Sequence, residues 1–246
     1  MRYKIADIIV DLDVQYPRLQ KQIKPYEYDG PAGVNVEIRL TEKLYQAYLE
    51  TYPDIDREMI EYIALGNEYY TALIHFNGML IHSSCVVYDG KAYLFSAPCG
   101  TGKSPHTQLW LKRVADAYIL NDDKPAIRIC PDGIFAYGTP FSGKTDLNVN
   151  KRVPIGGICM VQRSEANSIE RLSDEEALFG ILDQTVRPQE EEIMDKLLGV
   201  IDKIVRNVPV YRLKCNMELE AAEVAYNGMK GVNDHNYENK KRIYAT

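Results

Sequence analysis

The sequence lacks the features that would place it in several specialised classes of protein. It has no apolar run long enough to cross a bilayer, and the residues after Met1 do not read as a signal peptide. Its 5 cysteines are scattered without a Cys-x-x-Cys pair, which argues against a disulfide framework or a zinc site. We therefore expect a cytoplasmic protein with reduced thiols and no membrane partner.

Basic residues are too few to suggest a nucleic-acid-binding surface. Lys and Arg number 29 against 35 Asp and Glu, a formal net charge of −6, and no basic stripe is present. This balance argues against nucleic acid or an anionic membrane as the main partner. No repeat or low-complexity tract interrupts the 246 residues, which are enough to bury a core in one or two domains.

What the sequence does contain is a glycine-rich segment between a predicted strand and a predicted helix. The strand ends near Ser96, the turn runs Ala97-Pro98-Cys99-Gly100-Thr101-Gly102, and Lys103-Ser104 open a helix predicted to Asp116. Glycines let main-chain N–H groups face a ligand closely, and a helix N-terminus favours anions. The segment departs from G-x-x-x-x-G-K-[S/T] only at Ala97, so we predict a P-loop that binds nucleotide phosphates.

The residues of this segment have predicted roles in nucleotide binding. Main-chain N–H groups of Cys99, Gly100, Thr101, Gly102, Lys103 and Ser104 are expected to wrap the β-phosphate. The Lys103 ammonium would contact the β- and γ-phosphates, and the Ser104 hydroxyl would bind Mg²⁺. His106 could approach nucleotide or metal, or could be an exposed helical histidine.

Hairpins are predicted on both sides of the segment. Asp89-Gly90 joins the apolar runs 80–88 and 91–95, and both turn positions of such a hairpin need positive φ. Pro131-Asp132-Gly133 predicts a second hairpin. Ordinary P-loop proteins thread strand, helix and strand into a parallel sheet. Here we predict an α/β fold with a mixed, largely antiparallel sheet and flanking helices.

The rest of the chain predicts three parts. Residues 1–70 form an N-terminal α+β layer packed on the core, with strands near 3–10 and 34–40 and helices at 41–49 and 56–65. Residues 71–232 form the nucleotide-binding core, which begins with a strand at 71–76. The final third of the chain contains a helix with a Ser173–Glu176 capping box and a long amphipathic helix at about 190–205. Residues 233–246 are a polar tail.

Two adjacent aspartates follow the predicted strand at 118–120. One of Asp122 and Asp123 would hold Mg²⁺, with Asp122 the expected ligand, and the other would accept a proton from an attacking hydroxyl. The order of the two roles stays open, and both residues could instead be solvated turn residues. Adjacent strand side chains point to opposite faces, so the strand end must turn there. Lys144 would neutralise transition-state charge or bind the acceptor, unless it is a solvated loop lysine. His82 would orient an aspartate or contact phosphate, or be a buried structural histidine.

A P-loop between hairpins followed by an Asp-Asp pair resembles the catalytic domain of HPr kinase/phosphorylase and the wider phosphoenolpyruvate carboxykinase-like P-loop superfamily. The resemblance covers roughly residues 80–171 and rests on four segments: Ile81–Ser84, Gly100–Thr107, Leu120–Asp123 and Gly138–Lys144. It implies an ATP- and Mg²⁺-dependent kinase that transfers the γ-phosphoryl group to a hydroxyl of a peptide, a protein or a small molecule. Relatives of this type often assemble, so a homo-oligomer is one expectation.

Two alternatives remain open. Ala97 and Pro105 depart from the usual pattern, which is consistent with a nucleotide-binding sensor that has no turnover. Phosphate itself could occupy the loop, which would suit a phosphorylase on the same fold. The sequence does not identify the acceptor.

Overall fold

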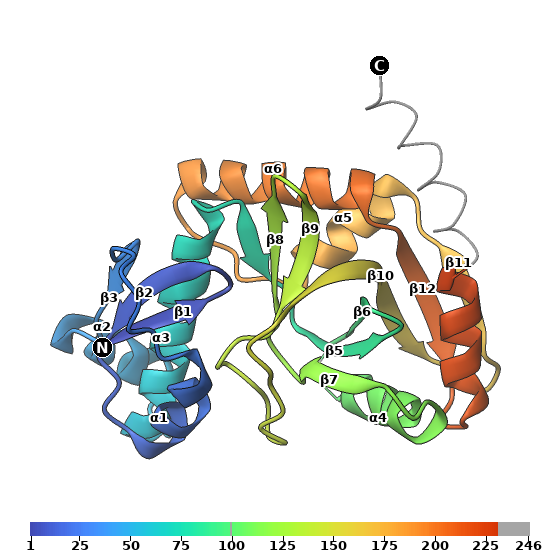
Figure 1. Ribbon diagram of the computed structural model, residues 1–246, viewed down its shortest axis with the longest axis horizontal. Coiled ribbons are helices and arrows are strands. Elements are labelled where there is room, and N and C mark those ends of the chain that lie inside the picture. The colour runs from blue at the N-terminus through green and yellow to red at the C-terminus, as the bar shows by residue number, and fades with distance from the viewer. Residues whose placement is uncertain (99, 231–246) are drawn as a thin grey trace.

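A mixed β-sheet organises most of the chain after residue 78 (Figure 1). The computed structural model describes residues 1–98 and 100–230; Cys99 and the predicted polar tail at 233–246 lie outside the described residues. The strands of this sheet are β4 (Gly78–Leu80), β5 (Ser83–Tyr88), β6 (Lys91–Ser96), β7 (Tyr118–Asn121), β8 (Ala126–Cys130), β9 (Gly133–Tyr137), β10 (Arg152–Arg163), β11 (Ser168–Arg171) and β12 (Val210–Cys215).

Antiparallel pairs dominate the sheet, but its centre is parallel. The order is β4-β8-β9-β10-β6-β5-β7, with β12 beside β10 and β11 beside β12. Strand β10 pairs in parallel with both β6 and β12 and antiparallel with β9. The prediction of a mixed, largely antiparallel α/β fold is therefore confirmed.

Both predicted hairpins form as expected. Asp89 and Gly90 take φ values of 51° and 69°, and Tyr88 pairs with Lys91 across this turn. Gly133, with φ of 144°, begins β9, which pairs with β8. The first hairpin sends β6 into the glycine-rich segment, and α4 (Lys103–Arg113) follows that segment.

Helices cover both faces of the sheet (Figure 1). Leu94 of β6 lies in one buried cluster with residues of α5 (Asp174–Leu182) and α6 (Glu191–Asn207). Its neighbours Tyr93 and Phe95 lie in a different cluster with Trp110 of α4. Because successive strand residues point to opposite faces, the two clusters lie on the two sides of β6. Residues 220–230 are also helical.

The C-terminal helices follow their local sequence signals. Ser173 and Glu176 form the predicted capping box at the start of α5. Helix α6 turns a buried stripe of Leu197, Ile201 and Ile204 toward the core. None of the helices in the described part of the chain is long and apolar enough to cross a membrane.

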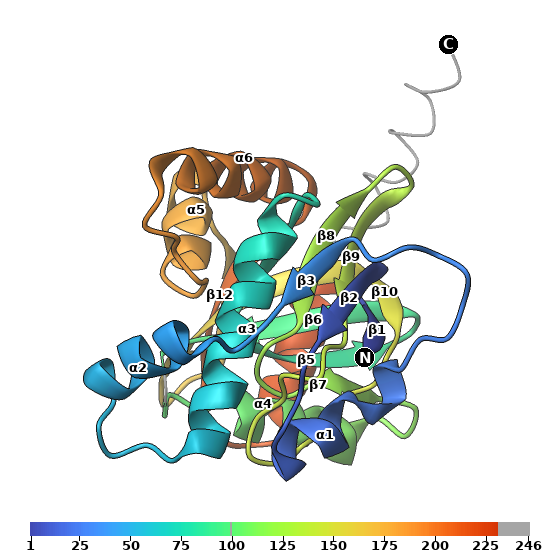
Figure 2. The ribbon, with the colours of Figure 1, turned by 90° about the vertical axis from the view of Figure 1, so that its left-hand side faces the viewer.

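The N-terminal residues form a small sheet and three helices on one side of the large sheet (Figure 2). The elements are β1 (Arg2–Ile5), β2 (Ile8–Leu12), α1 (Pro17–Ile23), the 3₁₀ helix Lys24–Tyr26, β3 (Val36–Ile38), α2 (Glu42–Thr51) and α3 (Arg57–Ile74). The predicted strand near 3–10 is instead the hairpin β1–β2, which turns at Ala6 and Asp7 with φ values of 48° and 61°.

Helix α3 corrects the prediction of a strand at 71–76. Asp56 caps its N-terminus through the Met59 N–H at 2.8 Å, and the helix continues to Ile74. Its Tyr69, Tyr70 and Leu73 pack in a cluster that contains both N-terminal side chains and Phe141 of the core. The apolar run at 71–74 extends this helical stripe, and the predicted boundary at residue 70 falls inside α3.

Candidate functional site

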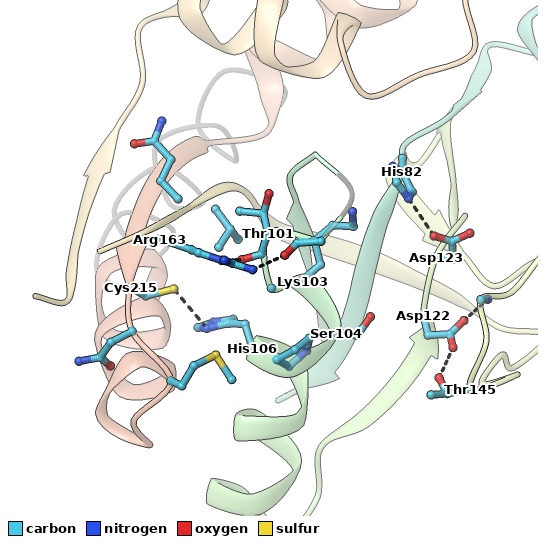
Figure 3. Close-up of a pocket in the computed structure, with 18 of the residues that line it drawn as sticks. His82, Thr101, Lys103, Ser104, His106, Asp122, Asp123, Thr145, Arg163 and Cys215 are labelled. Carbon is cyan, nitrogen blue, oxygen red and sulfur yellow. Dashed lines mark hydrogen bonds and ion pairs between the residues drawn. The ribbon is translucent and has the colours of Figure 1, made fainter. Parts of the chain in front are cut away.

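One cavity of about 680 Å³ brings together residues that the sequence placed in separate segments (Figure 3). It lies where the loop after β6, the start of α4, the end of β7 and the loop after Phe141 meet. Its lining contains the predicted site residues His82, Gly100, Thr101, Gly102, Lys103, Ser104, His106, Asp122, Asp123 and Lys144. Cys99, which was also predicted to bind nucleotide, lies outside the described residues.

Backbone conformation explains where this loop uses glycine. Gly100 and Gly102 take φ values of 79° and 124°, in the left-handed region that favours glycine. Ala97 has no positive φ, so the position where a first glycine was expected does not need glycine's freedom. The Lys103 ammonium donates to the Ala97 carbonyl at 2.7 Å and thus lies back across the loop.

Arg163 at the end of β10 also holds this loop, and sequence reasoning missed it. Its guanidinium donates to the Thr101 carbonyl at 3.0 Å and to the Gly100 carbonyl. The side chain lines the cavity as well. No motif marks Arg163, because the contact depends on the parallel pairing of β10 with β6.

The end of β7 turns in a way that lets both aspartates line the cavity. The Asn121 side-chain carbonyl accepts from the Asp123 N–H at 2.9 Å and the Lys124 N–H at 2.7 Å. This Asx-type turn supplies the change of direction that the adjacent aspartates require.

Asp122 is buried and is held by the loop that follows Phe141. Its carboxylate accepts from the Gly143 main-chain N–H and from the Thr145 hydroxyl. A Cβ at Gly143 would lie 3.3 Å from both Asp122 oxygens, so glycine lets the two chains approach closely. The Gly143-Lys144 pair was predicted, whereas the contact of Thr145 with Asp122 was not.

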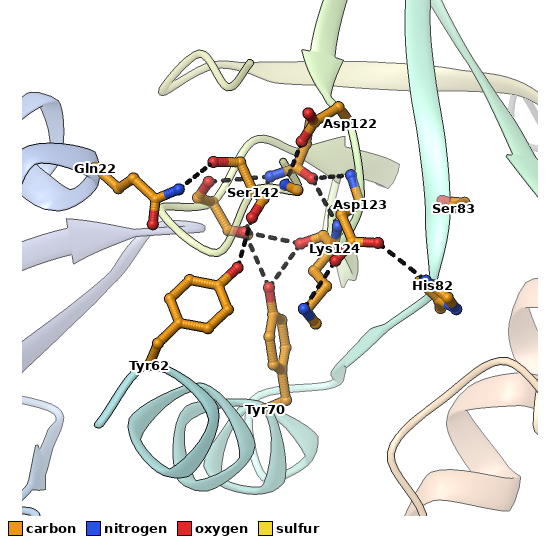
Figure 4. Close-up of polar contacts among 12 residues, drawn as sticks. Gln22, Tyr62, Tyr70, His82, Ser83, Asp122, Asp123, Lys124 and Ser142 are labelled. Carbon is orange, nitrogen blue, oxygen red and sulfur yellow. Dashed lines mark hydrogen bonds and ion pairs between the residues drawn. The ribbon is translucent and has the colours of Figure 1, made fainter. Parts of the chain in front are cut away.

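Asp123 lies between two nitrogen bases (Figure 4). Its carboxylate contacts His82 Nε2 at 2.9 Å and Lys124 Nζ at 2.8 Å. Burial by itself would raise the pKa of Asp123, but the hydrogen bond from His82 and the charge of Lys124 hold that pKa well below its usual range. Asp123 is therefore ionised at neutral pH.

His106 is a buried residue beneath the loop. The Trp110 indole donates to His106 Nε2 at 3.2 Å, the Cys215 Sγ lies 3.8 Å from Nδ1, and the ring packs at a tilt against Phe95. Burial lowers its pKa to about 4. The expectation of an exposed helical histidine is thus wrong, and both ring nitrogens face partners within the chain; its contact with nucleotide stays a prediction.

The N-terminal layer supports the acidic side of the cavity (Figure 4). From α3, the Tyr62 hydroxyl donates to the Ser142 carbonyl and the Tyr70 hydroxyl to the Lys124 carbonyl, each at 2.6 Å. From α1, the Gln22 amide donates to the Ser142 hydroxyl at 2.9 Å. These partners are distant in sequence, and nothing local to them marks the contacts.

The oxygen ligands in the cavity suit Mg²⁺. Ser104 and Asp122, the predicted ligands, both line it. Among the residues that the structure describes, no three His, Cys, Asp or Glu side chains are grouped to hold a metal by themselves. Mg²⁺ characteristically takes one or two protein oxygens and completes its shell with phosphate and water, so this ligand set fits a metal that arrives with a nucleotide.

Comparison with known proteins gives a distant structural likeness. No family model and no curated protein matches the sequence. Among solved structures, the HPr(Ser) kinase/phosphatase from Coxiella burnetii matches 61% of this chain and 95% of its own, with 13% sequence identity and a TM-score of 0.38. The function therefore has to be inferred from the residues of this chain.

Proposed function

We propose that this protein is an ATP-dependent kinase that transfers the γ-phosphoryl group to a hydroxyl acceptor. One observation carries the proposal: the glycine-rich loop and the start of α4 share a cavity with Asp122, Asp123, His82 and Lys144. A site that only bound an anion would have no need of two buried or half-buried carboxylates facing the anion. A phosphoryl-transfer site needs a carboxylate for the metal and a second for the acceptor.

The triphosphate would lie at the N-terminus of α4. Main-chain N–H groups of the loop and the helix would donate to it, and the Lys103 ammonium would exchange the Ala97 carbonyl for phosphate oxygens. Ser104 and Asp122 would hold Mg²⁺, which when bound neutralises charge on the phosphates. Lys144, exposed at the cavity edge, would approach the transferred group.

The acidic side of the cavity would receive the acceptor. As its hydroxyl oxygen bonds to the γ-phosphorus, the bond from that phosphorus to the β–γ bridging oxygen breaks and ADP leaves. The hydroxyl proton passes to Asp123, which His82 orients. The low pKa of Asp123 makes it a weak base. Phosphoryl transfer tolerates this, because its transition state is loose and mostly needs positioning and charge stabilisation.

A nucleotide sensor without turnover is the second candidate. Both oxygens of Asp122 already accept hydrogen bonds, from Gly143 and Thr145, and Asp123 is paired with two bases. With their oxygens held in these contacts, the two aspartates could help to close the site around a nucleotide without accepting a proton. The two candidates agree on ATP binding and differ only in the chemical step.

Substitution of Lys103 tests the shared claim. Lys103→Met keeps the aliphatic stem and removes the charge, and Lys112→Ala, at an exposed position of the same helix, is the matched control. Calorimetry should show that wild type and Lys112→Ala bind ATP·Mg²⁺ and that Lys103→Met binds at least about tenfold more weakly. Equal binding by all three would overturn the nucleotide site.

Transfer itself separates the kinase from the sensor. Wild type is incubated with γ-labelled ATP and a panel of hydroxyl acceptors that includes serine peptides, sugars and amino alcohols. Labelled product made by wild type and not by Lys103→Met supports the kinase. Tight ATP·Mg²⁺ binding without label transfer or phosphate release supports the sensor.

A further inference from the structure

The cavity extends well beyond what a triphosphate needs. Its volume of about 680 Å³ lies in the range of sites for whole small molecules. Figure 3 shows Lys103 and Ser104 between its two ends, with Asp122, Asp123 and His82 on one side and Cys215 on the other. The chemistry proposed above uses only the loop and the acidic end.

The second end combines apolar side chains with polar ones such as Arg163 and Asn216. Val161 near the end of β10 and Cys215 at the end of β12 are buried there, and Met217 follows with 59% of its surface exposed. A large apolar side chain that stays exposed on the wall of a cavity marks a surface that a ligand can cover. Methionine is well suited to this, since its flexible thioether adapts to flat rings.

The orientation of the triphosphate decides which part of the nucleotide reaches this end. The metal and the acceptor place the γ-phosphate toward the aspartates, so the α-phosphate and the nucleoside must extend the opposite way. Along that direction Pro105 and His106 form the first turn of α4, and His106 contacts Cys215.

We infer that this end of the cavity holds the nucleoside of ATP, with its base lying flat against Met217. The inference rests on the proposed function, since it assumes that a triphosphate occupies the loop.

The residues at this end of the cavity should distinguish one nucleotide base from another only weakly. The Asn216 amide already donates to the Glu165 carbonyl and accepts from the Glu218 N–H, and the Arg163 guanidinium is held by the loop carbonyls. These contacts already use some of the donors and acceptors of both side chains and fix how they are oriented, which limits how well they can match the edge of one particular base. Contact with Met217 depends on the flat face that all bases share, so ATP and GTP should bind within about fivefold of each other.

Calorimetry with three probes, each with Mg²⁺, tests the inference: ATP, GTP and inorganic tripolyphosphate. The variants are Met217→Ala and Met217→Glu. Leu219→Glu is the matched control, because Leu219 is also exposed, at 47%, lies two residues away and does not line the cavity. Circular dichroism checks that each variant is folded.

Met217→Ala should weaken ATP binding about fivefold and Met217→Glu about tenfold or more, with tripolyphosphate binding unchanged within about twofold. Leu219→Glu should leave both ligands unaffected. Unchanged ATP affinity in both Met217 variants, or an equal loss for ATP and tripolyphosphate, overturns the nucleoside site while the loop assignment stands. Wild type that binds neither ligand overturns the proposed function and this inference with it.

Discussion

Protonation of His106 should make the protein less stable in mild acid. The imidazole is 1% exposed and lies against Phe95, Trp110 and Cys215. Since the Trp110 indole donates to Nε2, the neutral ring carries its proton on Nδ1, toward Cys215. A second proton would have to displace the Trp110 hydrogen bond inside an apolar cluster.

The size of the effect follows from the two pKa values. His106 protonates near 4 in the folded chain and near 6.5 in the unfolded chain. Between these values the unfolded state binds more protons, so the free energy of unfolding falls as pH falls through this window. From pH 7 to pH 5 the loss is about 2 kcal/mol, since each pH unit below 6.5 costs about 1.4 kcal/mol.

Urea denaturation measures this loss directly. The sequence has 1 tryptophan, so the fluorescence of Trp110 reports unfolding and also the environment of its His106 partner. Wild type and His106→Gln are compared at pH 7 and pH 5, and the difference between their pH effects isolates His106 from the carboxylates. His75→Gln, at an exposed histidine, is the control. Equal pH effects in wild type and His106→Gln would refute the reasoning, as would a wild type equally stable at both values.

Three further outcomes are expected. Asp123→Asn should lower phosphoryl transfer at least about 100-fold and leave the ATP dissociation constant within about threefold. Asp132→Asn, in an exposed ion pair at the turn between β8 and β9, is the control. A larger effect on affinity than on rate would remove the base role. Gly102→Ala should destabilise the protein by about 1 kcal/mol or more, because φ at this position is 124°. Gly199→Ala, in an exposed turn of α6 with open space around it, should stabilise the protein by about 0.5–1 kcal/mol. Chemical denaturation that gives both changes the same sign would contradict the backbone assignment. Phe141→Ala should cost about 3–5 kcal/mol in the same assay, because its ring is fully buried against three tyrosines, and a cost below about 1 kcal/mol would show that the cluster is loosely packed.

Local sequence signals predicted much of the fold. Asp89-Gly90 fixes a hairpin because only a few residue types adopt positive φ twice in succession, and Ser173 with Glu176 satisfies the first N–H groups of α5 from within one turn. The run at 71–76 failed as a signal, since a short apolar stretch has the same composition in a buried strand and in a buried helix face. Packing of Leu73 beside Tyr69 and Tyr70 decides that it is helical.

The residues of the candidate site also fall into those that the sequence could predict and those that it could not. The glycine-rich loop and the adjacent aspartates could be found because each is contiguous in sequence. The burial of His106 could not, since it depends on Cys215, which is 109 residues away. Arg163 and Thr145 were missed for a related reason: an arginine or a threonine at a loop edge is ordinary until the fold brings it to a carbonyl or a carboxylate.

The contacts of Tyr62 and Gln22 with Ser142 have a consequence for how the chain can be shortened. A fragment that began at β4 would retain every residue of the glycine-rich loop and both aspartates. It would lose Gln22 and Tyr62, two of the N-terminal side chains that hold the segment after Phe141. That segment carries the Gly143 and Thr145 donors to Asp122. Such a fragment could still bind phosphate through the loop, although Asp122 would no longer be held in place. Its affinity for nucleotide would therefore not show whether the site still has the geometry needed for phosphoryl transfer.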